Sequence, residues 1–327
     1  MSQPLPDVDL ELHLTPDDLA AALRTDARRG LAAMPKTLPP KYFYDARGSA
    51  LFEEITRLPE YYPTRAEREI LAERAPAIAR ITGAKTLVEL GSGSSEKTRL
   101  LLDALLEHGT LGSFAPLDVS AAALTDALGA LRQDYPGLHL QGIVADFVNH
   151  LEVLPEAGTR LVAFLGGTIG NFTPAERAPF LAALRDRLSP GEFFLLGADL
   201  VKSPSVLVPA YDDAAGVTAE FNRNVLHVLN HSLGADFDPS AFTHVARWDA
   251  ANEWIEMRLR ADRAMTVSIP ALDLLVHFTE GEELRTEVSA KFRRDGLSDE
   301  LAAAGFAVRD WWTDRAERFA LTLAAAV

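Results

Sequence analysis

Hydrophobic residues in the first two thirds of the chain form five short, uninterrupted runs, and stretches with helical spacing of apolar residues separate them. A continuous apolar run of this length is typical of a strand that is buried on both faces of a sheet. Strands that alternate with helices predict a parallel, doubly wound α/β sheet. The expected strands are residues 86–90, 114–118, 138–144, 161–165 and 193–197.

The alternation stops near residue 200 and resumes near residue 298. We therefore expect a second, α+β unit, which the N-terminal segment and an insertion after the fifth strand form together. The cofactor unit would comprise residues 63–200 and 287–327, and the substrate-binding unit residues 11–62 and 201–286. The elements expected after residue 200 are helical at 206–232 and 298–304, and extended at 253–259, 265–269, 274–278, 307–312 and 319–323.

Prolines and helix-start signals organise the N-terminal segment. Thr15 is a helix N-cap, and we expect its helix to end at residue 28 or 29, before Gly30. Prolines at positions 35, 39 and 40 exclude a regular helix there, and Ser49 opens the next one. Residues before about Leu10 carry no pattern, and we expect them to be mobile. The four tyrosines of the proline-stiffened loops can equally line a pocket or pack a lid: Tyr42, Tyr44, Tyr61 and Tyr62.

Charge and composition narrow the classes of function. The formal net charge of −15 argues against a nucleic-acid or anionic-membrane partner, because either needs a basic face. With 0 cysteines there is no disulfide framework, thiolate metal site or cysteine nucleophile. The acidic segment 1–14 lacks a signal-peptide pattern, and no window approaches about 18 consecutive apolar residues. We expect a cytoplasmic protein without a metal site.

A glycine turn follows the first of the five strands. Gly91 and Gly93 allow a sharp turn and a close approach of a ligand, and Ser94 or Ser95 can cap the helix after them. Glu96 stands where a dinucleotide fingerprint has its third glycine. The turn therefore fits a nucleoside without phosphates, such as S-adenosylmethionine, better than a dinucleotide. A Gly/Ser surface loop between unrelated elements is the alternative.

Polar residues end the neighbouring strands. Asp118 lies where an acidic residue usually holds the ribose hydroxyls. Asp146 and Phe147 can accept from an adenine amine and stack on its ring, or they are a capping aspartate and a core phenylalanine. The loop 166–172 has three glycines and Asn171, which indicates backbone that a ligand approaches closely.

Five blocks of sequence, in order, carry a resemblance to a known family. Together they resemble the L-histidine Nα-methyltransferases of ergothioneine biosynthesis, and the resemblance extends from about Asp18 to the C-terminus. The helix and two strands at the C-terminus likewise resemble the closing hairpin of Rossmann-like, S-adenosylmethionine-dependent methyltransferases. The blocks are residues 35–45, 58–65, 89–93, 211–224 and 287–292.

The resemblance implies transfer of three methyl groups from S-adenosylmethionine to the α-amine of L-histidine, which gives hercynine and S-adenosylhomocysteine. Tyr44 and Asn171 would position the amine, and we assign no general base. One departure is Gly167, where the family pattern leads us to expect serine. By motif position, the cofactor would contact Gly91, Lys97, Asp118, Asp146 and Phe147, and histidine would contact Tyr61, Gly166, Asn171, Tyr211, Glu287 and Ser289.

The chemistry of the substrate gives these residues physical roles. Asn171 and Tyr211 can hold the carboxylate of histidine, and the faces of Tyr44 and Tyr61 tolerate a growing quaternary ammonium by cation–π attraction of about 0.5–2 kcal/mol. Glu287 and Ser289 are two residues apart, so in an extended segment their side chains face the same way. This pair would hold the two polar edges of an imidazole. Alone, it would more often be a solvent-facing strand edge.

Three alternatives remain open from the sequence. A related methyltransferase could act on tryptophan or another aromatic amino acid, with Met257 or another wall residue reshaping the pocket. A nicotinamide oxidoreductase is disfavoured by Glu96. A nucleotide-binding sensor without catalysis is the third. We expect a monomer with a small-molecule substrate.

Overall fold

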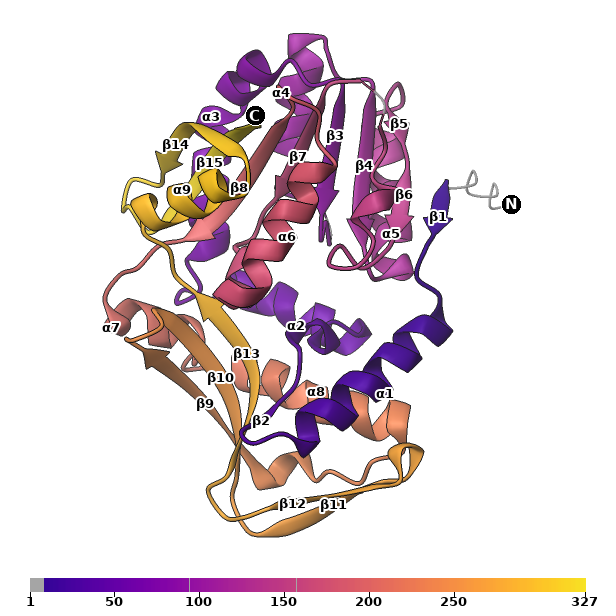
Figure 1. Ribbon diagram of the computed structural model, residues 1–327, viewed down its shortest axis with the longest axis vertical. Coiled ribbons are helices and arrows are strands. Elements are labelled where there is room, and N and C mark those ends of the chain that lie inside the picture. Colours follow the sequence, from indigo (N-terminus) through magenta and orange to yellow (C-terminus); the bar gives the residue numbers. More distant parts are fainter. Residues whose placement is uncertain (1–8, 94, 157) are drawn as a thin grey trace.

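The computed structural model describes residues 9–93, 95–156 and 158–327. It consists of two units, one above the other in Figure 1. The upper unit is a large sheet with helices on both faces. The lower unit combines a smaller sheet, a hairpin and further helices. The segment 1–8, which we expect to be mobile, lies outside the described residues, as does Ser94.

Within the described residues, the large sheet has nine strands, and it confirms the predicted Rossmann-like α/β fold. Its order is β1-β6-β4-β3-β7-β8-β15-β14, with β5 paired to β4. The strands from β1 to β8 in this order run parallel, and β15 pairs antiparallel with both β8 and β14. The strands are β1 (Leu10–Leu12), β3 (Thr86–Leu90), β4 (Ser113–Asp118), β5 (His139–Leu140), β6 (Gly142–Val144), β7 (Arg160–Phe164), β8 (Phe193–Asp199), β14 (Phe306–Thr313) and β15 (Phe319–Ala326).

Helices cover both faces of this sheet (Figure 1). Every residue of β3 and β7 is buried, as a strand with cores on both faces requires. Two clusters of buried apolar side chains fill the spaces between the sheet and the helices. The helices are α3 (Pro63–Thr82), α4 (Arg99–His108), α5 (Ala121–Asp134), α6 (Pro174–Asp186) and α9 (Arg294–Ala303).

The start of α4 differs from the prediction. Thr98 is its N-cap, so Lys97 precedes the helix. The prediction that Ser95 caps it is wrong, because Ser95 has φ 53° and lies in the preceding loop. Its hydroxyl donates instead to the buried carboxylate of Glu89, which lies in β3 before the turn.

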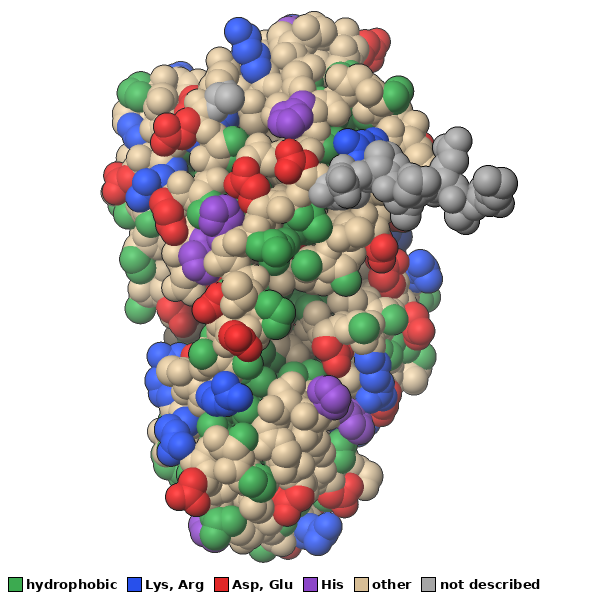
Figure 2. All heavy atoms as spheres, turned by 90° about the vertical axis from the view of Figure 1, so that its right-hand side faces the viewer, with side chains coloured by type: hydrophobic (Ala, Val, Ile, Leu, Met, Phe, Trp, Pro, Cys, Tyr) green, Lys and Arg blue, Asp and Glu red, His purple; other side chains and the backbone are tan. Residues whose placement is uncertain are grey.

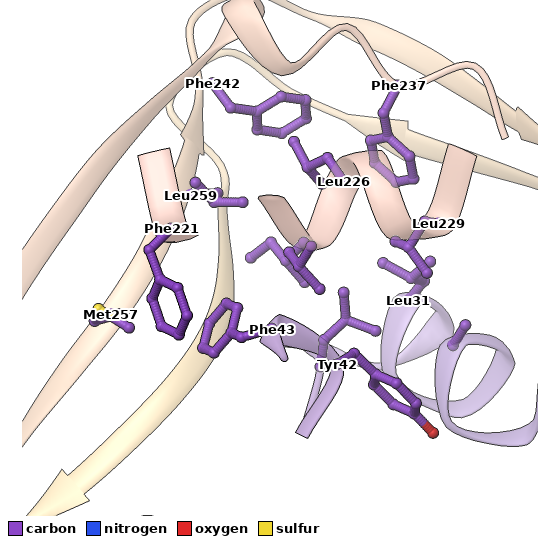
Figure 3. Close-up of a cluster of buried hydrophobic side chains, with 14 of the residues drawn as sticks. Leu31, Tyr42, Phe43, Phe221, Leu226, Leu229, Phe237, Phe242, Met257 and Leu259 are labelled. Atoms are coloured by element: carbon purple, nitrogen blue, oxygen red, sulfur yellow. The ribbon is translucent and has the colours of Figure 1, made fainter. Parts of the chain in front are cut away.

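The second unit is built on a four-stranded sheet in the order β2-β13-β10-β9, with a separate β11–β12 hairpin. Its core, part of which Figure 3 shows, joins Phe43, Phe221 and Met257. Among the described residues, four strands were not predicted: β1, β2, β9 and β13. The elements are β2 (Lys36–Thr37), β9 (Phe242–Asp249), β10 (Trp254–Ala261), β11 (Met265–Ile269), β12 (Leu274–Phe278), β13 (Glu283–Ala290), α1 (Pro16–Ala32), α2 (Ala46–Arg57), α7 (Pro204–Leu207) and α8 (Val217–Leu233).

Local hydrogen bonds and close packing determine where the first two helices begin and end. Thr15 and Asp18 form a capping box, which confirms the predicted start of α1. The helix continues past Gly30 to Ala32, so the predicted end at residue 28 or 29 is wrong. Glycine at position 30 allows the chain to pack closely there, because a Cβ would lie 2.0 Å from the carbonyl oxygen of Thr37. The prediction that Ser49 opens the next helix is wrong: Asp45 caps α2 and accepts from the N–H of Gly48 at 2.7 Å.

The two units meet where β13 passes the short 3-10 helix η3 (Thr168–Asn171), which follows β7. Gly170 permits this approach, because a Cβ there would lie 2.8 Å from the carbonyl oxygen of Ala290. Residue 287 lies within β13 and pairs with Met257 of β10. The division of the chain near residue 286 therefore stays a prediction. Within the described ranges, no helix is long and apolar enough to cross a membrane.

Candidate active site

The glycine turn lies at the carboxyl edge of the large sheet. Gly91 follows β3 with φ 67°, in the left-handed region, and its N–H donates to the carbonyl of Leu117 at 2.8 Å. A Cβ at Gly91 would lie 3.4 Å from Cε1 of Phe147, so the ring of Phe147 borders the turn. The structure thus brings together two of the residues expected around the cofactor.

Asp118 ends β4 beside the same turn. Its carboxylate accepts from the backbone N–H groups of Gly93 and Ser120, both at 3.0 Å. Burial raises the pKa of Asp118, and these N–H groups oppose the rise. A carboxylate has lone pairs beyond these two bonds. Asp118 can therefore accept hydrogen bonds from further donors, such as hydroxyl groups.

Asp146 follows β6 at the boundary between the units. It accepts from the backbone N–H of Val148 and from the side-chain amide of Asn149, both at 2.9 Å. Nζ of Lys41, from the N-terminal segment, lies 3.7 Å from its carboxylate. The surface is hollowed between the units on the face shown in Figure 2. A small pocket at this boundary is lined by Leu14, Leu19, Ala22, Lys41 and Tyr42 on one side, and by Val119 and Asp146 on the other.

A buried carboxylate joins Lys97 to the loop after β7. Glu67 of α3 is 0% exposed and contacts the ammonium group of Lys97. The same carboxylate accepts from the backbone N–H of Gly166 at 2.8 and 3.0 Å. Gly197 leaves the space for it, because a Cβ there would lie 2.2 Å from Oε1 of Glu67. One side chain thus holds a residue expected at the cofactor and a residue expected at the substrate.

Asn171 ends η3 and faces β13. Its side-chain amide nitrogen donates to Oε1 of Glu287 at 3.0 Å and to the carbonyl of Val288 at 2.9 Å. Both amide hydrogens therefore donate to β13, and only the amide oxygen of Asn171 is left to accept a hydrogen bond from a ligand. In this arrangement Asn171 has no N–H left for a substrate carboxylate. The structure brings Asn171 and Glu287 together.

Ser289 lies two residues further along β13, on the same face as Glu287. Its hydroxyl is 2.7 Å from the hydroxyl of Tyr211, and Nζ of Lys291 donates to both, at 2.8 and 2.7 Å. The carbonyl of Tyr211 is in turn 2.8 Å from Nε2 of the buried His244. Ser289 and Tyr211 thus belong to one connected set of polar side chains around Lys291, and Glu287 lies on the same face of β13 with Asn171 as its partner.

Aromatic side chains of the second unit form a wall beside this set. The ring of Tyr44 packs edge-on against Phe52 and Phe221, with 5.6 Å between centroids in each pair. Tyr61 packs edge-on against the same Phe52. Burial raises the pKa of Tyr61 well above its ordinary value, so its hydroxyl keeps its hydrogen. The two tyrosines expected near the amine thus share one wall.

The carboxylate of Glu287 has an unusual proton affinity. Burial raises its pKa to about 7, although the hydrogen bond from Asn171 and the charge of Lys291 oppose the rise. Near neutral pH this group therefore exists both as an acceptor-only carboxylate and as a carboxylic acid that can donate.

The chain matches the model of the protein family described as "Histidine-specific methyltransferase, SAM-dependent" over residues 23–326. The chain belongs to this family. It is 56% identical to the histidine N-alpha-methyltransferase of Mycolicibacterium smegmatis and 55% identical to that of Mycobacterium tuberculosis, over 97% of this chain and 99% of each relative. The ergothioneine biosynthesis protein 1 of Neurospora crassa is 30% identical over 85% of this chain and 32% of its own length. The predicted family and its S-adenosylmethionine dependence are thus confirmed.

Sequence reasoning missed two residues of this histidine-specific methyltransferase site, Glu67 and Lys291. Both are charged side chains whose partners lie far away in the sequence, such as Gly166 for Glu67 and Tyr211 for Lys291. A charged residue inside an apolar helix stripe is a signal for Glu67, which lies between the buried Ala66 and Ile70. Lys291 stands in one of the resemblance blocks, and its position there gave no indication of its burial.

Proposed function

We propose that this chain transfers three methyl groups from S-adenosylmethionine to the α-amine of L-histidine, giving hercynine, as a step of ergothioneine biosynthesis. The observation that carries the proposal is the pair Glu287 and Ser289 on one face of β13, tied to Asn171 and Tyr211 where the units meet. The similarity to two proteins named histidine N-alpha-methyltransferase supports it.

On the cofactor side, we assign Asp118 to the ribose hydroxyls, and Asp146 with Phe147 to the adenine. Gly91 allows the cofactor to approach the backbone, since no Cβ occupies the space beside the Phe147 ring. Lys97 would face the carboxylate of the methionine part, held in place by Glu67. These residues surround the carboxyl edge of β3, β4 and β6, where ligands of open α/β sheets bind.

On the substrate side, Glu287 and Ser289 would hold the imidazole, and Tyr211 the carboxylate. The amide oxygen of Asn171 would accept one N–H of the α-amine, because its own hydrogens are used by Glu287 and Val288. Gly166 would contribute close backbone approach, since its N–H is held by Glu67. Tyr44 and Tyr61 would flank the amine.

The reaction is an in-line displacement in which the amine nitrogen attacks the methyl carbon as the carbon–sulfur bond breaks. Holding the two reactants in line can remove roughly 7–11 kcal/mol of the barrier. The nitrogen must be uncharged when it attacks, so it loses a proton before the first transfer and after each of the first two. Asn171 and the tyrosines orient it without placing a full negative charge beside it, which would favour the ammonium form. The aromatic wall then stabilises the trimethylated cation.

Mass spectrometry of the products tests this function. The full-length protein is incubated with S-adenosylmethionine and each of the twenty amino acids, and the products are searched for gains of one, two and three methyl groups. We expect trimethylation of histidine alone at low enzyme concentration. Methylation of tryptophan in preference to histidine, or no methyl transfer at all, would overturn the proposal in favour of the aromatic amino acid or the sensor alternative.

We further propose that residues 63–200 and 287–327 act as the cofactor unit and residues 11–62 and 201–286 as the substrate unit of a monomeric, cytoplasmic enzyme. Light scattering of the purified protein tests this state, and a dimer at micromolar concentration would contradict it.

A further inference from the structure

Lys291 is a buried cation that none of the roles above uses. Its side chain is 0% exposed, and Nζ lies 3.0 Å from Oδ2 of Asp199. The other two neighbours of Nζ are the hydroxyl oxygens of Tyr211 at 2.7 Å and Ser289 at 2.8 Å. An ammonium group has three hydrogens and accepts none. Lys291 therefore donates to all three partners, and both hydroxyl groups are acceptors of its hydrogen bonds.

This arrangement leaves one hydroxyl hydrogen for a ligand. Tyr211 and Ser289 lie 2.7 Å apart, so one of them donates to the other. If Ser289 donates, Tyr211 keeps a hydrogen for the ligand and Ser289 offers only a lone pair. If Tyr211 donates, the roles are reversed. The two hydroxyl groups cannot both donate to the substrate while this set of hydrogen bonds is intact.

Asp199, the carboxylate that contacts Lys291, is itself held by residues of both units. Asp199, at the end of β8, also accepts from the hydroxyl of Tyr62 at 2.8 Å and from Nζ of Lys202 at 2.6 Å. The backbone N–H of Phe292 donates to the carbonyl of Asp199 at 2.8 Å, so the residue after Lys291 is tied to the same strand end. The ammonium group is thus held between the large sheet and β13.

We propose that Lys291 is a positioning residue that makes Tyr211 a donor to the substrate carboxylate and Ser289 an acceptor for a ring N–H of the imidazole. The inference rests on the proposed function, because it takes the substrate carboxylate to lie at Tyr211. A carboxylate accepts hydrogen bonds only, so the hydrogen of Tyr211 points to it. The hydrogen of Ser289 then points to Tyr211, and the ring must supply a hydrogen at the Ser289 edge.

With Ser289 as an acceptor, the bound ring and the site must share a fixed number of protons. Neutral imidazole carries one N–H, and this N–H donates its hydrogen bond to the hydroxyl oxygen of Ser289. The opposite ring nitrogen faces Glu287, and a hydrogen is needed between them. That hydrogen resides either on the ring or on Glu287, so the pair of substrate and site holds one proton more than neutral histidine beside a carboxylate. Rings without an N–H, such as that of thiazolylalanine, leave the lone pair of Ser289 unpaired and are rejected.

Nitrogen NMR tests the inference directly. The full-length protein is saturated with S-adenosylhomocysteine and with histidine labelled with ¹⁵N in the ring, because the ¹⁵N shift distinguishes a protonated from a bare nitrogen. The nitrogen at Ser289 is identified as the one whose shift changes most in Ser289→Ala. We expect that nitrogen to be protonated in the wild type. A bare nitrogen at this edge would overturn the proposal.

Substitutions of Lys291 separate positioning from folding. Lys291→Met should raise the Kd of histidine roughly 10- to 100-fold, as loss of hydrogen bonds to a charged group predicts, and alter the ¹⁵N shift at the Ser289 edge. Lys291→Gln, which keeps two hydrogens, should recover part of the affinity. Lys202→Met is the matched control, because it removes the other lysine at Asp199 without touching either hydroxyl, and it should leave the ¹⁵N shift unchanged.

The outcomes distinguish this inference from the proposed function. An unchanged histidine affinity and ¹⁵N shift in Lys291→Met would overturn the inference. A shift that changes equally in Lys202→Met would assign the effect to general structure and also overturn it. If Lys291→Met fails to bind S-adenosylhomocysteine, the wild-type and Ser289→Ala spectra decide alone. Bound histidine that is never methylated in the wild type would instead count against the proposed function.

Discussion

Glu287 is a carboxylate that the fold keeps in a place unfavourable to its charge. It lies where β13 passes η3, and its one side-chain hydrogen-bond donor is the amide of Asn171. Glu283, on the same strand, lies instead between Arg258 and Arg260. The surroundings raise the pKa of the first to about 7 and lower that of the second below its ordinary value. One strand thus carries a carboxylate suited to a ligand and another that supports the fold.

The substrate role of Glu287 predicts a change of specificity. In Glu287→Ala the imidazole loses its charged partner, and we expect the Kd of histidine to rise roughly 10- to 100-fold. Binding of phenylalanine or tryptophan should improve relative to histidine, because no buried carboxylate is left unpaired by an apolar ring. Calorimetry with the S-adenosylhomocysteine complex measures both affinities. An unchanged affinity for histidine would remove Glu287 from the site.

The raised pKa of Glu287 predicts a pH-dependent stability. The folded protein holds the proton up to about pH 7, whereas the unfolded chain releases it near 4.5. Between these values the folded state binds more protons, so this group lowers stability as the pH rises, and the full penalty is present above pH 7. Glu287→Gln should therefore be more stable than the wild type at pH 8, by about 1–3 kcal/mol, and nearly equal to it near pH 4.5.

Glu283→Gln is the control for this experiment. Burial opposes the lowered pKa of Glu283, while Arg260 and Arg258 cause it. Its contribution to stability is present above the unfolded pKa and disappears as the pH falls. The substitution should therefore destabilise the protein at pH 8 and have little effect in acid, the reverse of Glu287→Gln. Urea unfolding at both pH values gives the comparison, and equal effects of the two substitutions would contradict the assignment.

At the scale of elements, periodicity was sufficient for the strands with strong patterns. Four of the five expected central strands and the β11–β12 hairpin follow from uninterrupted or alternating apolar residues, whereas the strand expected at 138–144 is divided into β5 and β6. Strand β1 has three residues and β9 exposes much of its length, so neither carries a clear apolar pattern. The start of α2 was missed because Asp45 rather than Ser49 supplies the capping oxygen. For the site, motif position indicated Glu287 and Ser289, whereas Glu67 and Lys291 acquire their partners only in the folded chain.

The contacts of Glu67 in α3 predict that the stability of the protein depends strongly on this one side chain. Glu67→Ala would leave the ammonium of Lys97 and the N–H of Gly166 without their buried partner. We expect a loss of about 1–3 kcal/mol in unfolding free energy, because both groups lose hydrogen bonds to a charged partner, while the ammonium of Lys97 is 23% exposed and can reach water. Glu69→Ala, two residues on in the same helix, removes a partner of the exposed Arg315 and should cost at most about 1 kcal/mol. Similar losses in the two variants, measured by urea unfolding, would contradict the linking role of Glu67.

At the scale of the whole molecule, the N-terminal segment of the second unit reaches the cofactor end of the first. Lys41 contacts both Asp26 of α1, at 3.2 Å, and Asp146, at 3.7 Å. The pocket that Lys41 and Asp146 border is also lined by Leu14, Leu19 and Ala22 around the start of α1. A cofactor at Asp146 would therefore fill space between the units and bury apolar surface of both. Its binding energy would then hold the two units together, which excludes water from the cleft.

This geometry predicts that cofactor binding protects both units from hydrogen exchange. With S-adenosylhomocysteine, amide exchange should slow after β3 and β6, and also in α1, although α1 belongs to the other unit. Lys41→Ala removes the charged contact between Asp26 and Asp146, so protection of α1 should decrease while protection of the glycine turn persists. Arg29→Ala, which removes an exposed partner of the same Asp26, is the control and should leave both unchanged. Protection confined to the large sheet would contradict this prediction. It would show that the first unit alone forms the cofactor site and that α1 makes no contribution to cofactor binding.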